Sequence, residues 1–202
     1  MRRFALVVSM MFVLGLAAMA EEGKAAPGLK IGDACPTFQS LQCACGKVVS
    51  ADDFKHDALV ICITCNHCPV AVAYEDRIID FCKKHAGENG KVGFIAINVN
   101  NTEADSLPKM KERFKEKNFN FYYAIDPSQK IARDLGAKVT PHFFVFNKER
   151  KLVYMGAMDD NMDASKATRN FVEEACVACI NGTMPKMTST QAKGCGIKWD
   201  KK

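Results

Sequence analysis

The sequence lacks a strong excess of charge of one sign. Lysine and arginine number 28 against 23 aspartate and glutamate, a net charge of +5 in 202 residues. It also lacks any run of basic residues interleaved with aromatics, so it makes no case for binding nucleic acid. There are no internal repeats or low-complexity stretches, and nothing indicates a repeat architecture.

Beyond residue 20 the sequence lacks an apolar run long enough to span a membrane, which needs about 20 residues. The first twenty residues have the pattern of a signal peptide: two arginines, an apolar stretch over residues 4–16 and the small-x-small motif Ala18-Met19-Ala20. The apolar stretch is short for an uncleaved anchor, so we expect cleavage between Ala20 and Glu21. The expected location is the periplasm or outside the cell, with no stable membrane insertion of the mature chain.

The remaining sequence has the composition of one globular domain. Removal of the two leader arginines leaves 26 basic against 23 acidic residues, or +3, and the whole chain is 48% apolar and 25% charged. The expected organisation is a signal peptide, a flexible leader, one domain and an irregular C-terminal tail, over residues 1–20, 21–30, 31–182 and 183–202.

The spacing of apolar residues predicts strands that alternate with helices. Expected strands cover residues 57–64, 91–99, 119–124, 142–146 and 152–155, and expected helices cover 66–84, 106–117, 128–135 and 164–180. The last two strands form a hairpin. The predicted fold class is therefore α/β, with a central mixed sheet flanked by helices.

The motif Cys65-Asn66-His67-Cys68 lies where a buried strand meets a helix. The positive end of a helix stabilises a thiolate, which is the reactive form of cysteine. We expect Cys65 to be the exposed nucleophile, Cys68 the more buried resolving cysteine, and His67 a positive charge that favours the thiolate. The alternatives are half of a structural zinc site, which needs two more ligands, and a static disulfide.

A second motif, Val139-Thr140-Pro141, precedes an apolar strand and suits a turn with a cis bond. With the dithiol, it resembles the thioredoxin superfamily, in which a cis-proline loop lies against the CxxC motif and pairs its backbone with the substrate. The resemblance implies a thioredoxin-like fold, with Pro141 as the cis-proline and Thr140 as the residue that contacts the partner.

The lead-in over residues 32–38, GDACPTF, is similar to the G-D-x-x-P-x-F motif of the redoxin branch, which joins peroxiredoxin-like and exported thioredoxin-like proteins. Residues 65–70, 74–77, 140–146 and 194–199 resemble an uncharacterised bacterial subgroup of it. The resemblance implies a thiol-disulfide oxidoreductase that exchanges disulfides with exported proteins and with an electron donor or acceptor protein. No metal or other cofactor is expected, and the direction of electron flow stays open.

The sequence departs from that pattern in two places. Thr64 stands where an aromatic residue usually precedes the first cysteine, and the strand before the dithiol lacks the buried aspartate of thioredoxin. Glu75 is a candidate for proton handling, although a solvated helix acid is the simpler interpretation.

Two other functions are weighed against disulfide exchange. A peroxiredoxin-like peroxidase requires P-x-x-x-T-x-x-C, but neither Cys65 nor Cys68 has a threonine three residues before it. A Cu(I)-binding or delivery protein would use the two soft thiolates, with imidazole from His67 or His142.

The chain has ten cysteines, a high number for an exported protein. Cys62 and Cys82 fit buried small hydrophobes. Apart from these two and the Cys65/Cys68 pair, six cysteines remain, and we expect them to form structural disulfides whose pairing is open: Cys35, Cys43, Cys45, Cys176, Cys179 and Cys195. Alternatives are a redox relay or a four-thiolate zinc site involving the second Cys-x-x-Cys pair. Cys195 is expected in a mobile tail.

Overall fold

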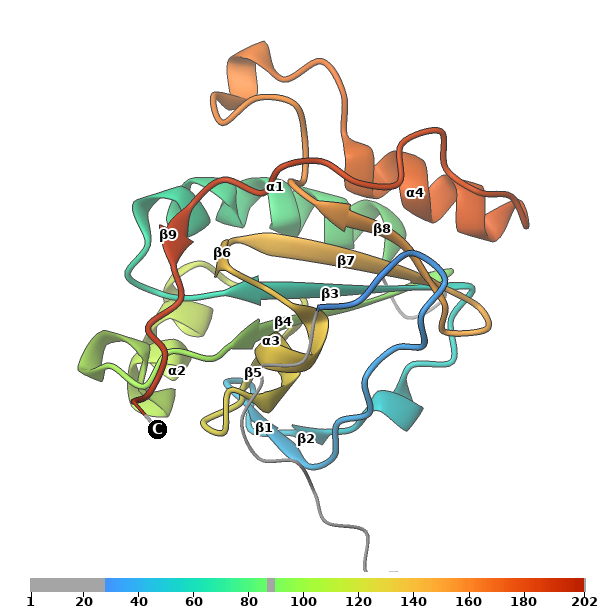
Figure 1. The fold of residues 1–202 in the computed structure, drawn as a ribbon. Helices are drawn as coiled ribbons and strands as arrows, with labels where there is room; N and C mark the ends of the chain where they lie inside the picture. Colours follow the sequence, from blue (N-terminus) through green and yellow to red (C-terminus); the bar gives the residue numbers. More distant parts are fainter. Residues whose placement is uncertain (1–27, 87–89, 202) are drawn as a thin grey trace, which may run out of the picture.

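The computed structural model describes residues 28–86 and 90–201. The expected signal peptide over residues 1–20 lies outside the described residues, as does most of the leader. A seven-stranded sheet with the order β2-β1-β5-β4-β3-β7-β8 forms the centre of the fold (Figure 1). The central strands β3, β4 and β5 are parallel, and β7 and β8 extend the sheet as an antiparallel hairpin. This mixed sheet confirms the predicted fold class.

The elements follow the predicted order. The strands are β1 Leu41–Cys43, β2 Val48–Val49, β3 Ala58–Thr64, β4 Val92–Asn98, β5 Tyr122–Ile125, β6 Val139–Thr140, β7 His142–Asn147, β8 Leu152–Gly156 and β9 Cys195–Gly196. The α-helices are α1 Pro69–His85, α2 Leu107–Glu116, α3 Lys130–Leu135 and α4 Phe171–Ile180, with short 3-10 helices at Ala51–Asp53, Glu103–Asp105 and Ala164–Lys166.

Two apolar layers cover the two faces of the sheet. One contains side chains of α1, α2 and α4, such as Ile78, Met110 and Val172. The other contains α3 and the N-terminal segment, with side chains such as Phe38 and Ile131. Because both faces are covered, the central strands are buried along almost their whole length, which explains their continuous apolar sequences.

Two helices begin later than predicted. The residue before a proline favours an extended backbone. Cys68 accordingly has φ −77° and ψ 118°, and α1 starts at Pro69 rather than at residue 66. In the last helix, the Asn170 side chain accepts a hydrogen bond from the Glu173 N–H and caps a start at Phe171, whereas the prediction placed it at residue 164. Among the described residues, no helix combines the length and apolar content needed to cross a bilayer.

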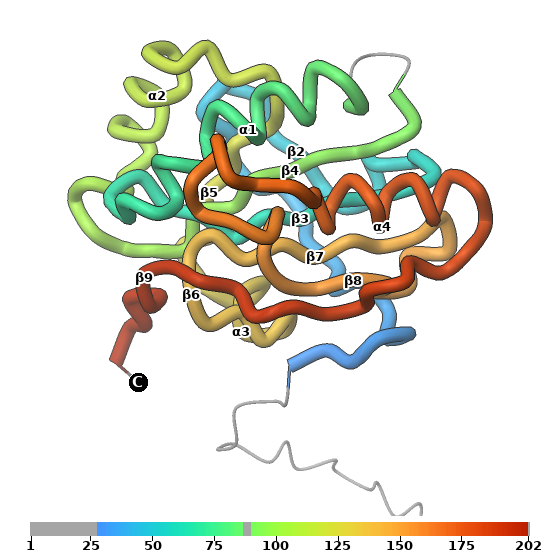
Figure 2. Tube along the Cα trace, turned by 90° about the horizontal axis from the view of Figure 1, so that it is seen from above, coloured from blue at the N-terminus to red at the C-terminus, as the bar shows by residue number. Residues whose placement is uncertain are grey.

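The C-terminal tail is packed against the domain. It passes Met155, which pairs with Ser189, and then forms the short strand β9 beside β6 (Figure 2). Ile197, just after β9, is 7% exposed. The expectation that Cys195 lies in a mobile tail is therefore wrong, because the segment around it is held by strand pairing and apolar burial.

Candidate active site

The dithiol lies between the end of β3 and the start of α1. Cys68 is the N-cap residue of α1, and Pro69 is the first residue of the helix, where its missing N–H costs nothing. The loop between β6 and β7 faces both sulfurs, and its Thr140–Pro141 peptide bond is cis, as the sequence predicts. The Cys65 Sγ lies 3.2 Å from the Thr140 hydroxyl, and the Cys68 thiol donates to the Thr140 carbonyl oxygen at 3.1 Å.

Cys65 is not the exposed cysteine that the sequence suggested. Cys65 is 3% exposed, and Cys68 is 0% exposed. Burial, and to a smaller degree the carboxylate of Asp105, raise the pKa of the Cys65 thiol to about 11, against the lowering effect of the Thr140 hydroxyl. Cys65 is therefore protonated at neutral pH.

Cys68 has the opposite tendency. Burial opposes its ionisation, but hydrogen bonding with the Cys195 thiol and with the backbone N–H groups of Ala71 and Cys195 lowers its pKa. Cys68 lies at the N-terminus of a helix, where several backbone N–H groups have no partner within the helix. Within the pair, Cys68 is thus the sulfur better suited to carry the thiolate, the reverse of the roles predicted from the sequence.

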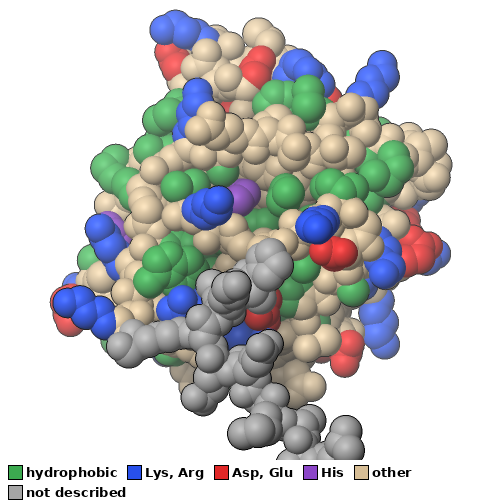
Figure 3. All heavy atoms as spheres, in the orientation of Figure 1, with side chains coloured by type: hydrophobic (Ala, Val, Ile, Leu, Met, Phe, Trp, Pro, Cys, Tyr) green, Lys and Arg blue, Asp and Glu red, His purple; other side chains and the backbone are tan. Residues whose placement is uncertain are grey.

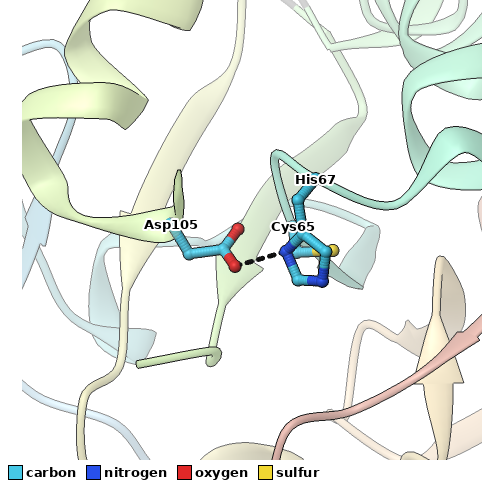
Figure 4. Close-up of side chains that lie close together, drawn as sticks. All are labelled: Cys65, His67 and Asp105. Atoms are coloured by element: carbon cyan, nitrogen blue, oxygen red, sulfur yellow. Dashed lines mark hydrogen bonds and ion pairs between the residues drawn. The ribbon is translucent and has the colours of Figure 1, made fainter. Parts of the chain in front are cut away.

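Asp105 is a residue of the site that the sequence analysis missed. It is fully buried, and its carboxylate accepts hydrogen bonds from the Asn66 backbone N–H at 2.8 Å, the Thr102 hydroxyl at 2.6 Å and the Asn98 side-chain amide at 3.1 Å. The His67 ring, 29% exposed, donates to it through Nδ1 at 2.5 Å (Figure 4). The loop that carries the dithiol is therefore fixed to the loop after β4 by this one carboxylate.

The position of Asp105 follows from the topology. The parallel strands β3 and β4 end side by side, with Thr64 opposite Asn98. Residues that follow two such strands meet at one edge of the sheet, where sites of α/β proteins form. An acid soon after the second predicted strand was the signal available in the sequence. His67 does not present an isolated positive charge to the dithiol, because it is paired with this carboxylate.

Cys65, His67 and Asp105 form the one group of three or more metal-ligating side chains found in the described part of the chain. Their ligand atoms lie within 4.8 Å of one another. In the present arrangement a proton links His67 to Asp105, so an ion would have to replace that hydrogen bond. His142, the other expected imidazole, packs against Phe144 with ring centres 4.4 Å apart and ring planes tilted by 36°, and is not part of this group.

A third sulfur completes the site. The Sγ of Cys195 lies 2.6 Å from the Sγ of Cys68, and the Cys195 backbone N–H donates to the same Cys68 sulfur at 3.3 Å. The motif around Cys195 was noted only as part of a resemblance, and its sequence distance of 127 residues gave no physical signal of this contact.

The other candidate residues have structural surroundings. Glu75 is 7% exposed and accepts two hydrogen bonds from the Arg113 guanidinium, at 3.0 and 2.6 Å, so it is neither a solvated helix acid nor in contact with the dithiol. Cys62 and Cys82 are buried, as predicted. All ten cysteines, from Cys35 to Cys195, are free, so the expected structural disulfides are not formed in this structure.

Comparison with known proteins supports this fold. The family model for Redoxin matches residues 30–171. An uncharacterized conserved protein from Geobacillus kaustophilus is 30% identical, with a TM-score of 0.78 over 86% of this chain and 94% of that chain. A hypothetical protein from Sinorhizobium meliloti 1021 is 28% identical, with a TM-score of 0.79 over 87% and 98%.

A more distant structure shares the fold alone. A thiol:disulfide interchange protein of the thioredoxin family from Chlorobium tepidum TLS is 18% identical, with a TM-score of 0.53 over 63% of this chain and 87% of that one. A search of curated proteins found no match.

Proposed function

Because this chain belongs to the redoxin family, within the thioredoxin superfamily, we propose that it is an exported thiol-disulfide oxidoreductase whose redox couple is Cys65 and Cys68. Family membership supports thiol redox chemistry in general. The observation that carries the finer proposal is the position of Cys68 at the N-cap of α1, with its pKa lowered and the Thr140–Pro141 loop beside it. The signal-peptide pattern supports export.

The proposed reaction is a two-electron exchange. When the protein acts as reductant, the bond between the two cysteine sulfurs forms as a disulfide of the partner breaks, and the partner leaves as two thiols. When it acts as oxidant, the same steps run backward. Cys68 is assigned the thiolate role, and Cys65 the resolving role, because an attacking or leaving sulfur works best as a stable thiolate.

Partner binding is assigned to Thr140 and Pro141. A hollow of about 320 Å³ opens beside Pro141 and includes Tyr74, Met158 and Thr190 in its lining. On the face drawn in Figure 3, acidic and basic side chains are scattered among uncharged ones. This mixed surface favours recognition of a partner by shape and backbone pairing over recognition by one sign of charge.

The test is the reduction potential of the mature protein, measured against glutathione buffers with Cys68→Ser as the control. A value of about −120 to −180 mV would assign an oxidase or isomerase, and about −270 mV or lower a reductant that needs an electron donor. If no two-electron transition appears, or Cys68→Ser leaves it unchanged, the proposal is wrong.

Metal binding is the second candidate, since Cys65, His67 and Asp105 lie together. Thiolate, imidazole and carboxylate together suit Zn²⁺ better than Cu(I), which prefers softer ligands. Titration of the reduced protein with each ion separates the two. Binding that is lost in both Cys65→Ser and His67→Ala would favour a metal protein, and the absence of stoichiometric binding would exclude it.

A further inference from the structure

The proposed redox pair is shielded from any partner. Cys65 is 3% exposed and Cys68 is 0% exposed, so neither residue offers a bulky partner disulfide more than a trace of surface. Disulfide exchange requires direct contact between the attacking and the attacked sulfur. The site therefore needs a sulfur that reaches both the solvent and the pair. Cys195 is such a sulfur, because it is only partly buried and its Sγ lies 2.6 Å from that of Cys68.

The strand that carries Cys195 is held in place beside the dithiol. Strand β9 pairs antiparallel with β6, with Cys195 opposite Thr140 and Gly196 opposite Val139. Both views of the chain place β9 next to β6 (Figures 1 and 2). Thr140 is also the residue whose side chain and carbonyl contact Cys65 and Cys68, so one short backbone segment aligns all three sulfurs.

Contacts on both sides of Cys195 fix this position. On the side before it, a Cβ at Gly194 would overlap the Thr140 carbonyl oxygen, so the close approach depends on glycine at this position. On the side after it, the Ile197 N–H donates to the Lys138 carbonyl at 3.2 Å, and the Lys198 carbonyl accepts from the Gln129 side chain at 2.8 Å. Contact between Cys195 and Cys68 is thus built into the packing of the tail.

We propose that Cys195 is a third redox cysteine that relays disulfide exchange between external partners and the buried pair. The inference rests on the proposed function, because it assigns the route by which Cys65 and Cys68 exchange electrons. The substrates of this relay are disulfides or thiols that can reach Cys195 at the molecular surface.

The relay balances as three exchange steps. The Cys195 thiol gives up its proton and attacks a partner disulfide, which forms a mixed disulfide and releases the first partner thiol. Cys68 then attacks the Cys195 sulfur, which forms the Cys68–Cys195 bond and releases the second partner thiol. Finally Cys65 attacks Cys68, which forms the Cys65–Cys68 bond and returns Cys195 as a thiol. Two electrons pass from the protein to the partner, and each attacking thiol gives up a proton that a released thiolate takes.

A kinetic experiment tests the relay. The fully reduced, signal-free chain is mixed with glutathione disulfide, and formation of the Cys65–Cys68 bond is followed by acid quenching, alkylation and peptide mass spectrometry. Cys195→Ser should slow this step by about tenfold or more, since the attack loses its positioned intermediary. Cys45→Ser, which removes another accessible thiol, should react at the wild-type rate.

The outcomes separate the relay from the proposed function. Equal rates for wild type and Cys195→Ser, with a normal Cys65–Cys68 disulfide, would overturn the relay alone. Failure of the wild-type protein to form that disulfide would overturn the proposed function.

Trapping variants identify the intermediates. With Cys65→Ser the relay should stop at a Cys68–Cys195 disulfide, and with Cys68→Ser it should stop with glutathione on Cys195. Glutathione on Cys68 in the Cys65→Ser protein, with Cys195 still a thiol, would contradict the order of the steps and overturn the relay.

Two glycine variants test whether docking of the tail matters without removing a sulfur. Gly194→Ala should push the tail away from Thr140 and slow the reaction as Cys195→Ser does. Gly196→Ala is the matched control, because a Cβ there meets nothing within 4 Å. Wild-type rates in both variants would contradict the relay, which requires the docked strand.

Discussion

Two Cys-x-x-Cys pairs of identical spacing lie near opposite helix ends in this molecule, one just before α1 and one within α4. Cys65 and Cys68 lead into the N-terminus of α1, whereas Cys176 and Cys179 lie in the second half of α4. Burial raises the pKa of Cys176 well above its ordinary value and that of Cys179 to about 11. Cys68 is also buried, yet its pKa is lowered.

The difference shows that the spacing of a cysteine pair does not determine its reactivity. At a helix start, N–H groups point toward the sulfur and the helix dipole favours negative charge. Near a helix end, carbonyl groups and the negative end of the dipole oppose a thiolate. The α4 pair belongs to the same apolar cluster as Cys82 and Ala175, whereas the loop that carries Cys65 and Cys68 is hydrogen-bonded to Asp105. We expect Cys65 and Cys68 to take part in disulfide exchange, and Cys176 and Cys179 to have a structural role.

Substitution of one cysteine in each pair gives the largest expected contrast. Cys68→Ser should reduce disulfide exchange by several orders of magnitude, because the Cys65–Cys68 disulfide can no longer form. Cys179→Ser should retain the wild-type rate. The measurement is turnover of a fluorescent disulfide peptide. Similar losses in both variants would mean that the α4 pair takes part in the chemistry.

The pH dependence of alkylation compares the two pairs without mutation. Since the Cys179 pKa is about 11, only about one part in a thousand is thiolate at pH 8, whereas the pKa of Cys68 is lowered by its hydrogen bonds and Cys68 ionises at lower pH. Labelling of Cys68 by iodoacetamide should therefore rise and level off at lower pH than that of Cys179. Mass spectrometry of each peptide gives the two profiles, and coincident midpoints would contradict the contrast.

Much of the fold was predictable because apolar residues form continuous runs in the buried strands and recur every three or four residues in the amphipathic helices. The strands β3 and β4, the β7–β8 hairpin and the cis bond before Pro141 were all predicted from the sequence. Helix starts were less accurate, because the preference of Cys68 for an extended backbone before Pro69 outweighs the helical pattern.

The site was only partly predictable. The sequence identified Cys65, Cys68 and Thr140, which the fold brings together, but it predicted an exposed Cys65, whereas both cysteines are buried. Burial depends on the whole packing, which local sequence does not contain. The contact of Cys195 could not be found from local pattern for the same reason, and the only local signal of Asp105 was an acid soon after a predicted strand: each reaches the dithiol through pairing of segments that are far apart in the chain.

Loss of the Asp105 carboxylate should bring the pKa of Cys65 closer to the ordinary value of a cysteine. Asp105→Asn leaves donors of the site without their acceptor and should destabilise the fold by about 2 kcal/mol in urea unfolding. Since the carboxylate raises the Cys65 pKa, the alkylation midpoint of Cys65 should fall below its value of about 11.

Asp126→Asn is the matched control for stability. Its carboxylate is buried and accepts the Ile131 N–H at 2.9 Å, away from the dithiol. It should cost similar stability and leave the Cys65 midpoint unchanged. The same shift in both variants would show that Asp105 acts only through the general stability of the fold.

The smallest effect is expected from Cys176→Ala, which tests whether the α4 pair is structural. Exchange activity should be unchanged, and the small cavity should cost about 1 kcal/mol of unfolding free energy at pH 7. The native pKa of Cys176 is raised, so its contribution to stability is complete below about pH 9 and declines as the unfolded chain ionises above it. Because this decline is about 1.4 kcal/mol per pH unit above that point, the gap between wild type and Cys176→Ala should vanish or change sign by about pH 10. Urea unfolding at pH 7 and pH 10 measures it, and a gap that stays constant would mean that Cys176 is not held as a neutral thiol in the core.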